Sequence, residues 1–118
     1  MNIVEKQKWG QTTETFRGLK NEDGKQVYSK GVNEINPYGM IPIHFHNEDN
    51  EDYIPITSGI KIVVISQEES EKMTKIRKLL IKSESVKIGE TVPCPKGYAH
   101  ALYNASDNVG LVDFVKYY

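Results

Sequence analysis

Residues 44–53 read HFHNEDNEDY, and they hold two of the three histidines in this 118-residue chain. On a β-strand, residues two apart point to the same face, so His44 and His46 are predicted to project side by side while Phe45 faces away. Residues 47–50 are polar and typical of a turn. The stretch therefore predicts a strand with two imidazoles on one face, followed directly by a turn.

The spacing after this turn brings a carboxylate beside the two imidazoles. If residues 47–50 form a four-residue hairpin loop, His46 pairs with Glu51 and His44 pairs with Tyr53. Directly opposed residues share a face, so Glu51 joins the imidazoles and Asp52 points away. Two imidazoles and one carboxylate suit a divalent first-row metal. The alternative is a surface loop of acids beside two incidental histidines.

The second informative stretch is residues 89–104, GETVPCPKGYAHALYN, which contains the third histidine. It fits the second motif of the cupin superfamily at all the fixed positions, which are Gly89, Pro95, Gly97, His100 and Asn104. The first cupin motif is Gly, His-x-His, three or four residues, Glu, six residues and Gly, and residues 39–59 resemble it. The chain is therefore similar to a cupin over about residues 39–104.

Two intervals in residues 39–59 differ from the cupin pattern. Four residues separate Gly39 from His44, where five is usual, and seven separate Glu51 from Gly59, where six is usual. Pro55 lies in the second interval, and proline within a strand is found mainly at edges and bulges. A bulge near Pro55 is therefore expected to absorb the extra residue.

The resemblance implies one metal ion held by four side chains, which are His44, His46, Glu51 and His100. These ligand types suit manganese, iron, nickel or zinc and do not choose among them. Cupins with this ligand set include sugar isomerases, epimerases, decarboxylases and dioxygenases. We therefore expect a metalloenzyme that acts on a small polar metabolite. The alternative is a non-catalytic cupin that binds or senses a sugar or another small molecule.

Two further side chains are expected on the inner face of the barrel, where they could orient a ligand. Tyr53 is the candidate catalytic residue, either beside the metal ligands or as an acid or base, and the alternative is a tyrosine packed in the barrel. Asn104 shares the face of His100 and Leu102, because all three lie at even spacing on one strand.

The whole chain, residues 1–118, is predicted to be a single all-β domain with the cupin double-stranded β-helix, or jelly-roll barrel, and at most one short helix. Its parts are N-terminal strands in 1–38, the first motif at about 39–59, a spacer at 60–88, the second motif at 89–104 and a final strand at 111–118. Asp23-Gly24 predicts a hairpin whose arms are residues 12–19 and 25–32.

The spacer is expected to begin with a buried strand at 59–66 and to end with another at 81–88. Ser66 and Glu69 have the spacing of a capping box, and Met73, Ile76 and Leu80 follow at helical spacing. Residues 67–80 are therefore either a short helix or a charged hairpin arm. The basic residues of this region could attract an acidic substrate, although a solvated face is the simpler interpretation.

Composition excludes several classes of protein. The formal net charge of −1 does not provide the basic footprint of a nucleic-acid-binding domain. The apolar runs are too short to span a membrane, and no segment resembles a signal peptide. The single cysteine, Cys94, cannot form an internal disulfide, and we expect a buried, inert thiol in a cytoplasmic protein.

Oligomeric state follows only from the resemblance. In cupins an N-terminal strand often pairs with a partner subunit, so a homodimer is expected. Trp9, Phe16 and Tyr28 are then expected to be core or dimer contacts, with pocket walls as the alternative.

Overall fold

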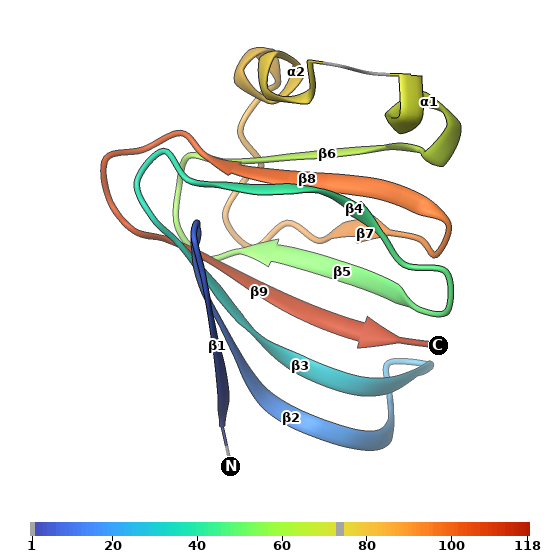
Figure 1. The fold of residues 1–118 in the computed structure, drawn as a ribbon. Coiled ribbons are helices and arrows are strands. Elements are labelled where there is room, and N and C mark those ends of the chain that lie inside the picture. The colour runs from blue at the N-terminus through green and yellow to red at the C-terminus, as the bar shows by residue number, and fades with distance from the viewer. Residues whose placement is uncertain (1, 73–74) are drawn as a thin grey trace.

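The computed structural model describes residues 2–72 and 75–118, which form two antiparallel sheets that face each other (Figure 1). The six-stranded sheet has the order β1 (Ile3–Gln7), β2 (Gly10–Glu22), β3 (Lys25–Ile35), β9 (Gly110–Tyr117), β5 (Asn50–Pro55) and β7 (Val92–Cys94). The three-stranded sheet has the order β4 (Met40–Phe45), β8 (Tyr98–Asn104) and β6 (Ile60–Ser66). The prediction of an all-β jelly roll is confirmed.

The main core lies between the two sheets and is built from strand positions that alternate in and out. Its buried members are Ile35, Ile41, Tyr53, Ile60, Cys94, Leu102, Val112 and Phe114. On β8, His100 and Leu102 face this core, whereas Ala101 and Tyr103 belong to a second apolar cluster on the opposite face. The faces predicted for β8 are therefore correct.

Two short helices, α1 (Gln67–Lys72) and α2 (Ile76–Lys82), cover the outer side of the three-stranded sheet (Figure 1). The prediction of at most one helix is therefore wrong, and of the two alternatives left open for residues 67–80 the described residues form helices and not a hairpin arm. The Ser66 hydroxyl accepts a hydrogen bond from the Glu69 amide at 3.1 Å, which caps α1. Met73, part of the predicted helical pattern, lies outside the described residues.

The predicted strand at 81–88 is wrong. Helix α2 continues to Lys82 because Ile76 and Leu80, one turn apart, are buried against the sheet. Residues 84–87 have no regular secondary structure, although the Val86 amide donates to the Ile60 carbonyl at 2.8 Å. A segment beside a sheet edge can thus make a backbone hydrogen bond to the edge strand without pairing as a strand.

The hairpin at Asp23-Gly24 is confirmed, and its arms are longer than predicted. Asp23 and Gly24 have φ of 52° and 76°, the positive values of a two-residue turn. The arms are β2 and β3, which pair from Glu22 and Lys25 back to Gly10 and Ile35.

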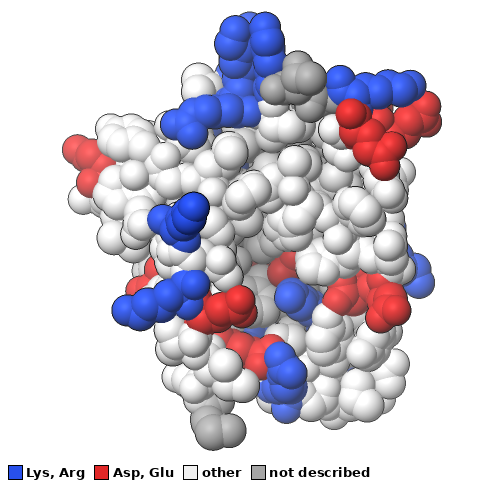
Figure 2. Space-filling model, in the orientation of Figure 1, with Lys and Arg blue, Asp and Glu red and all other residues white. Residues whose placement is uncertain are grey.

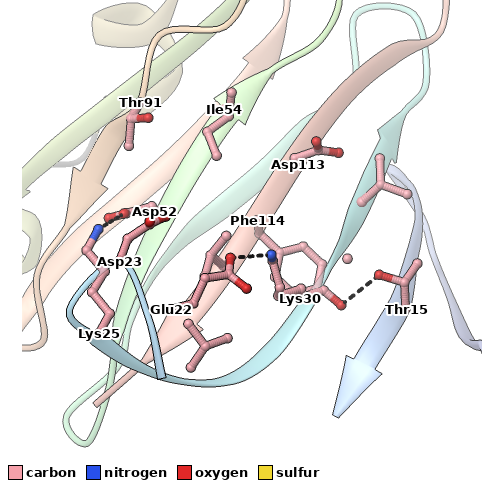
Figure 3. Close-up of a pocket in the computed structure, with 14 residues that line it drawn as sticks. Thr15, Glu22, Asp23, Lys25, Lys30, Asp52, Ile54, Thr91, Asp113 and Phe114 are labelled. Atoms are coloured by element: carbon pink, nitrogen blue, oxygen red, sulfur yellow. Dashed lines mark hydrogen bonds and ion pairs between the residues drawn. The ribbon is translucent and has the colours of Figure 1, made fainter. Parts of the chain in front are cut away.

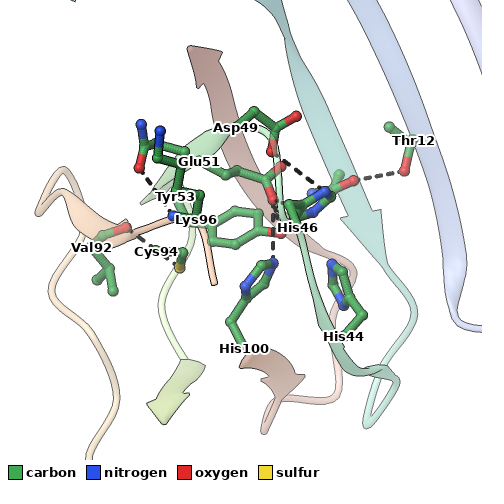
Figure 4. Close-up of polar contacts among 12 residues, drawn as sticks. Thr12, His44, His46, Asp49, Glu51, Tyr53, Val92, Cys94, Lys96 and His100 are labelled. Carbon is green, nitrogen blue, oxygen red and sulfur yellow. Dashed lines mark hydrogen bonds and ion pairs between the residues drawn. The ribbon is translucent and has the colours of Figure 1, made fainter. Parts of the chain in front are cut away.

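The predicted hairpin between the strands of the first motif is wrong. Strand β4 pairs with β8, so His44 lies opposite His100, whereas Glu51 on β5 lies opposite Lys116 and Cys94. Residues 46–49 therefore cross from one sheet to the other. His46 does not pair with Glu51, but both still point into the space between the sheets (Figure 4).

The extra residue near Pro55 is absorbed just after that proline. The amides of Ile56 and Thr57 both donate to the Leu111 carbonyl, at 2.8 and 3.4 Å. The register of β5 with β9 is unbroken through Pro55, so the predicted bulge does not form within the strand, and the extra residue lies in the bend that follows it.

Candidate metal centre

Four side chains that could hold a metal ion converge between the two sheets (Figure 4). One ligand atom from each lies within 4.8 Å of the others, and the four residues are His44, His46, Glu51 and His100. The three imidazole centroids are 4.2 to 5.4 Å apart. His100 and Glu51 are 1% and 3% exposed, so both lie at the buried base of the group.

The hydrogen bonding of the imidazoles suits the binding of a cation. Nδ1 of His44 lies 2.8 Å from the Pro42 carbonyl, which can only accept, so Nδ1 carries the proton and Nε2 is left as a ligand atom. Among the described residues, Nε2 of His46 and both ring nitrogens of His100 are buried without a hydrogen-bond partner. Buried polar atoms are normally satisfied, and a bound cation would satisfy Nε2 of His46 and one of the two ring nitrogens of His100.

Glu51 supplies the negative charge of the cluster. Its Oε1 lies 3.4 Å from His46 Nε2 and 3.3 Å from His100 Nε2. Burial alone would raise the pKa of Glu51, but His100, His46, Lys116 and Tyr53 together outweigh burial and hold this pKa well below its usual range. The carboxylate is therefore ionised at neutral pH and available to a cation.

The two half-buried members of the cluster, His44 and His46, have opposite pKa shifts. Burial, followed by the nearby His100, lowers the pKa of His44. Contact with Glu51 raises the pKa of His46. Neutral imidazole is the form that binds metal, so His44 is ready to bind, and a metal must displace a proton more often from His46.

Asp49 is a functional candidate that the sequence analysis missed. Its Oδ1 lies 3.5 Å from His46 Nδ1, and its Oδ2 accepts a hydrogen bond from the Tyr28 hydroxyl. Although it lies in a polar turn, Asp49 is only 9% exposed. A carboxylate behind a ligating imidazole fixes the ring and its tautomer, so Tyr28 and Asp49 are suited to hold His46.

The loop that carries His46 is fixed by the turn that precedes β8. The Gly97 amide donates to the His46 carbonyl at 2.7 Å, and the Lys96 amide donates to Asn50 Oδ1 at 3.0 Å. Gly97 has φ of +83°, which a residue with a side chain rarely adopts. The turn in the second motif thus positions a side chain of the first.

Tyr53, the predicted catalytic residue, lies in the pocket but is not opposite His44. It pairs with Phe114 and Val92, and its hydroxyl donates to Glu51 Oε1 at 2.7 Å. Burial, then the charge of Glu51, raises the pKa of Tyr53 well above its ordinary value. The hydroxyl therefore stays protonated at neutral pH and is better suited to orient Glu51 than to transfer a proton.

The predicted role of Asn104 in ligand binding is wrong. Its amide donates to the carbonyls of Ile35, Asn36 and Asn108 at 2.8 to 3.2 Å, and its Oδ1 accepts from Ser106. Asn104 lies four residues from His100 along β8, roughly 13 Å at the rise of a strand. It closes the end of the barrel opposite the histidine cluster.

An open pocket of about 110 Å³ lies over the cluster. It is lined by Trp9, Thr12, Asn33, Ile41, His44, His46, Glu51, Tyr53, Phe114 and Lys116. Trp9 was expected to be a core or dimer contact, and it both packs on the core and forms a pocket wall. Leu102 does not line the pocket, because it is fully buried in the core.

A larger pocket of about 490 Å³ lies elsewhere and does not include any of the four residues (Figure 3). Its charged side chains are mostly paired, with Lys25 at 2.7 Å from Asp52 and Lys30 at 2.5 Å from Glu22. The basic residues of the spacer gather over the helices in Figure 2 and line neither pocket. A solvated face is the interpretation that the structure favours for them.

A family model described as Cupin matches residues 12–116. The chain belongs to the cupin family. Among curated proteins, the comparison finds no match to this cupin. Within the described ranges, no helix is long and apolar enough to cross a membrane.

Solved structures with the same fold come from proteins of different kinds. The Cnp3 cupin domain of Schizosaccharomyces pombe has a TM-score of 0.66 at 12% identity, over 98% of this chain and 67% of that one. CapF of Staphylococcus aureus, a capsular polysaccharide assembling protein, has a TM-score of 0.68 at 17% identity, over 98% of this chain but only 28% of CapF. KdgF of Halomonas sp. has a TM-score of 0.62 at 6% identity, over 97% and 84%. At these identities the likeness shows the fold alone.

Proposed function

We propose that this cupin binds one divalent metal ion, of manganese, iron, nickel or zinc, and acts as a metalloenzyme on a small polar metabolite. The proposed ligands are His44, His46, Glu51 and His100. The observation that carries the proposal is the convergence of their ligand atoms within 4.8 Å, at the base of an open pocket. A closed structural site is usually rich in cysteine, and this cluster contains none.

Some residues around such a site orient the metal ligands, and others form the walls of the pocket. Asp49 and the Pro42 carbonyl hold two imidazoles by their Nδ1 atoms, and Tyr53 holds Glu51. Trp9, Ile41 and Phe114 give the pocket apolar walls that limit water and the size of the ligand. A bound divalent ion would supply a Lewis acid that polarises an oxygen of the metabolite.

A non-catalytic binding or sensing role is the second candidate, and one observation favours it. Among the described residues that line the pocket, the titratable side chains are the proposed metal ligands, Tyr53 and Lys116. The Tyr53 hydroxyl stays protonated and donates to Glu51, so Lys116 is the remaining candidate for a general acid or base among these lining residues. A screen for turnover of hydroxy acids and sugars by metal-loaded protein separates the two functions.

Metal content tests the site itself. We expect about one metal per chain in protein purified without an affinity tag, and a sharp fall in the His100→Ala variant, because its imidazole lies at the buried base of the cluster. Chelation should lower the melting temperature by roughly 10 °C if the metal was present at a hundredfold excess over its dissociation constant. Unchanged metal content in His100→Ala would contradict the proposed ligands.

The homodimer and the cytoplasmic location stay predictions, as does the absence of a nucleic-acid partner. Strand β1 supports a dimer, because all five of its residues are exposed and it lies at the edge of the six-stranded sheet.

A further inference from the structure

Lys116 brings a positive charge to the pocket above the proposed metal site. It lies on β9 in register with Glu51, and it lines the pocket together with that residue. Directly opposed residues on one face have Cβ atoms roughly 5 Å apart, so the two side chains start side by side. The ammonium lies 5.6 Å from the centroid of the Phe114 ring, which directs it along the pocket wall.

Lys116 has no ion-pair partner among the described residues, unlike the lysines of the larger pocket. The two acids whose pKa Lys116 lowers, Glu14 and Glu51, already have other partners. Glu14 is bound by Arg17 at 2.8 Å and by the Ser29 hydroxyl at 2.6 Å, while Glu51 is bound by Tyr53. Lys116 lowers the pKa of both acids through space, without a direct contact to either. Its charge is therefore available to a ligand.

The neighbouring wall adds a hydrogen-bond donor. The Thr12 hydroxyl donates to Asn33 Oδ1 at 2.7 Å, so the acceptor of that amide is already used. No described residue accepts a hydrogen bond from Asn33 Nδ2, and both residues line the pocket. The wall thus presents an ammonium and an amide N–H, both suited to an oxygen that carries negative charge.

The pocket also limits the size of its ligand. Its volume of about 110 Å³ is well below the roughly 300–1,000 Å³ of a drug-sized site. Lys116 and a divalent ion would together exceed the negative charge of Glu51 and Asp49, so the filled site would favour an anion.

We propose that the ligand of this site is a small carboxylate with an adjacent oxygen, of the 2-hydroxy or 2-oxo acid class, and that Lys116 pairs with its carboxylate. The inference rests on the metal site proposed above, which would bind the adjacent oxygen. It narrows the small polar metabolite to an anion and makes Lys116 a determinant of specificity.

Glycolate and glycolamide test this, because the two molecules have the same shape and differ in charge. Binding of each to manganese-loaded protein is followed by calorimetry and by water-proton relaxation, in wild type and in Lys116→Gln. We expect Lys116→Gln to weaken glycolate binding about tenfold, the effect of one charge-assisted hydrogen bond, and to change glycolamide binding less than about twofold. Lys72→Gln, an exposed lysine on α1, is the control for net charge.

Each other outcome has a definite meaning. An equal loss for both ligands, or no loss for either, would overturn the role of Lys116 while leaving the metal site intact. Wild-type protein that holds no metal would overturn the metal site and the inference together. Lys116→Arg keeps the charge and should keep the preference for glycolate, and Lys116→Met is a second neutral variant if Lys116→Gln does not fold.

Discussion

Glu51 and Asp52 are neighbours on β5, and they are buried on opposite faces of the six-stranded sheet. Glu51 points inward to three imidazoles and Tyr53, whereas Asp52 points outward to Lys25 at 2.7 Å and to the Tyr117 hydroxyl at 3.0 Å (Figures 3 and 4). They are 3% and 4% exposed. The outward acid has a permanent cation of its own, but the inward acid faces rings that are neutral when they bind metal.

The different partners of Asp52 and Glu51 show when a buried charge indicates a functional site. Buried ionised groups need a partner, and Asp52 has one supplied by the chain. Glu51 has a positively charged partner in direct contact only if the histidines are protonated or a cation is bound. A buried acid surrounded by neutral donors of metal-ligand type is thus a stronger sign of a metal site than an acid in an ion pair.

The largest expected effect tests the two acids directly. Glu51→Gln should weaken metal affinity by more than about 100-fold, since loss of an outer partner of a ligand already costs 10–100-fold. Asp52→Asn should leave metal affinity unchanged, because its side chain is on the other face. Competition with a chromophoric chelator measures both, and a reversed order would overturn the assignment.

A smaller effect is expected from the residue behind His46. Asp49→Asn should weaken metal affinity by about 10-fold, at the lower end for such a partner, because the amide still contacts the ring. Glu48→Gln is the matched control, since Glu48 lies in the same turn but is exposed. Equal affinities for the two variants would show that Asp49 does not hold the imidazole.

The smallest effect concerns the outward acid. A double-mutant cycle of Asp52→Asn and Lys25→Gln should give a coupling energy of about 1 kcal/mol or less in the free energy of unfolding, because the Lys25 side chain is 41% exposed and screened by solvent. Urea unfolding with and without chelator measures it. The coupling energy should be the same in both conditions. A coupling energy that changes with metal would contradict the independence of Asp52 from the metal site on the opposite face of the sheet.

The sequence predicted the inward direction of Glu51 correctly, although the hairpin used to argue it does not form. The alternation of side chains is a property of β5 itself, so it holds whichever strand β5 pairs with. The turn residues at 47–50 suit a hairpin or a crossing between sheets equally well, and only tertiary packing decides between them. The pairing of His44 with His100 was therefore beyond local reasoning.

Other parts of the site gave no clear local signal. Asp49 resembles any solvated acid in a turn, and its burial depends on Tyr28, which is 21 residues away in the sequence. Lys116 looks like an ordinary strand lysine until β9 is placed beside β5. By contrast, the second motif combines Gly97, which allows the turn, with His100 on the strand that follows. The local sequence therefore predicts both the turn and the proposed metal ligand.

The proposed ligands are divided between the two sheets, since His100 lies on β8 and Glu51 on β5. At the far end of the barrel, Asn104 joins β3, β8 and the turn before β9 by hydrogen bonds that need no ion. One end of the barrel is thus closed permanently, and the other depends on what occupies the cluster. Amide protons of β4 and β5 near the cluster would then exchange with solvent at a rate set by metal supply, while those near Asn104 would not. The rate of amide exchange near the cluster would therefore report the concentration of metal around the protein.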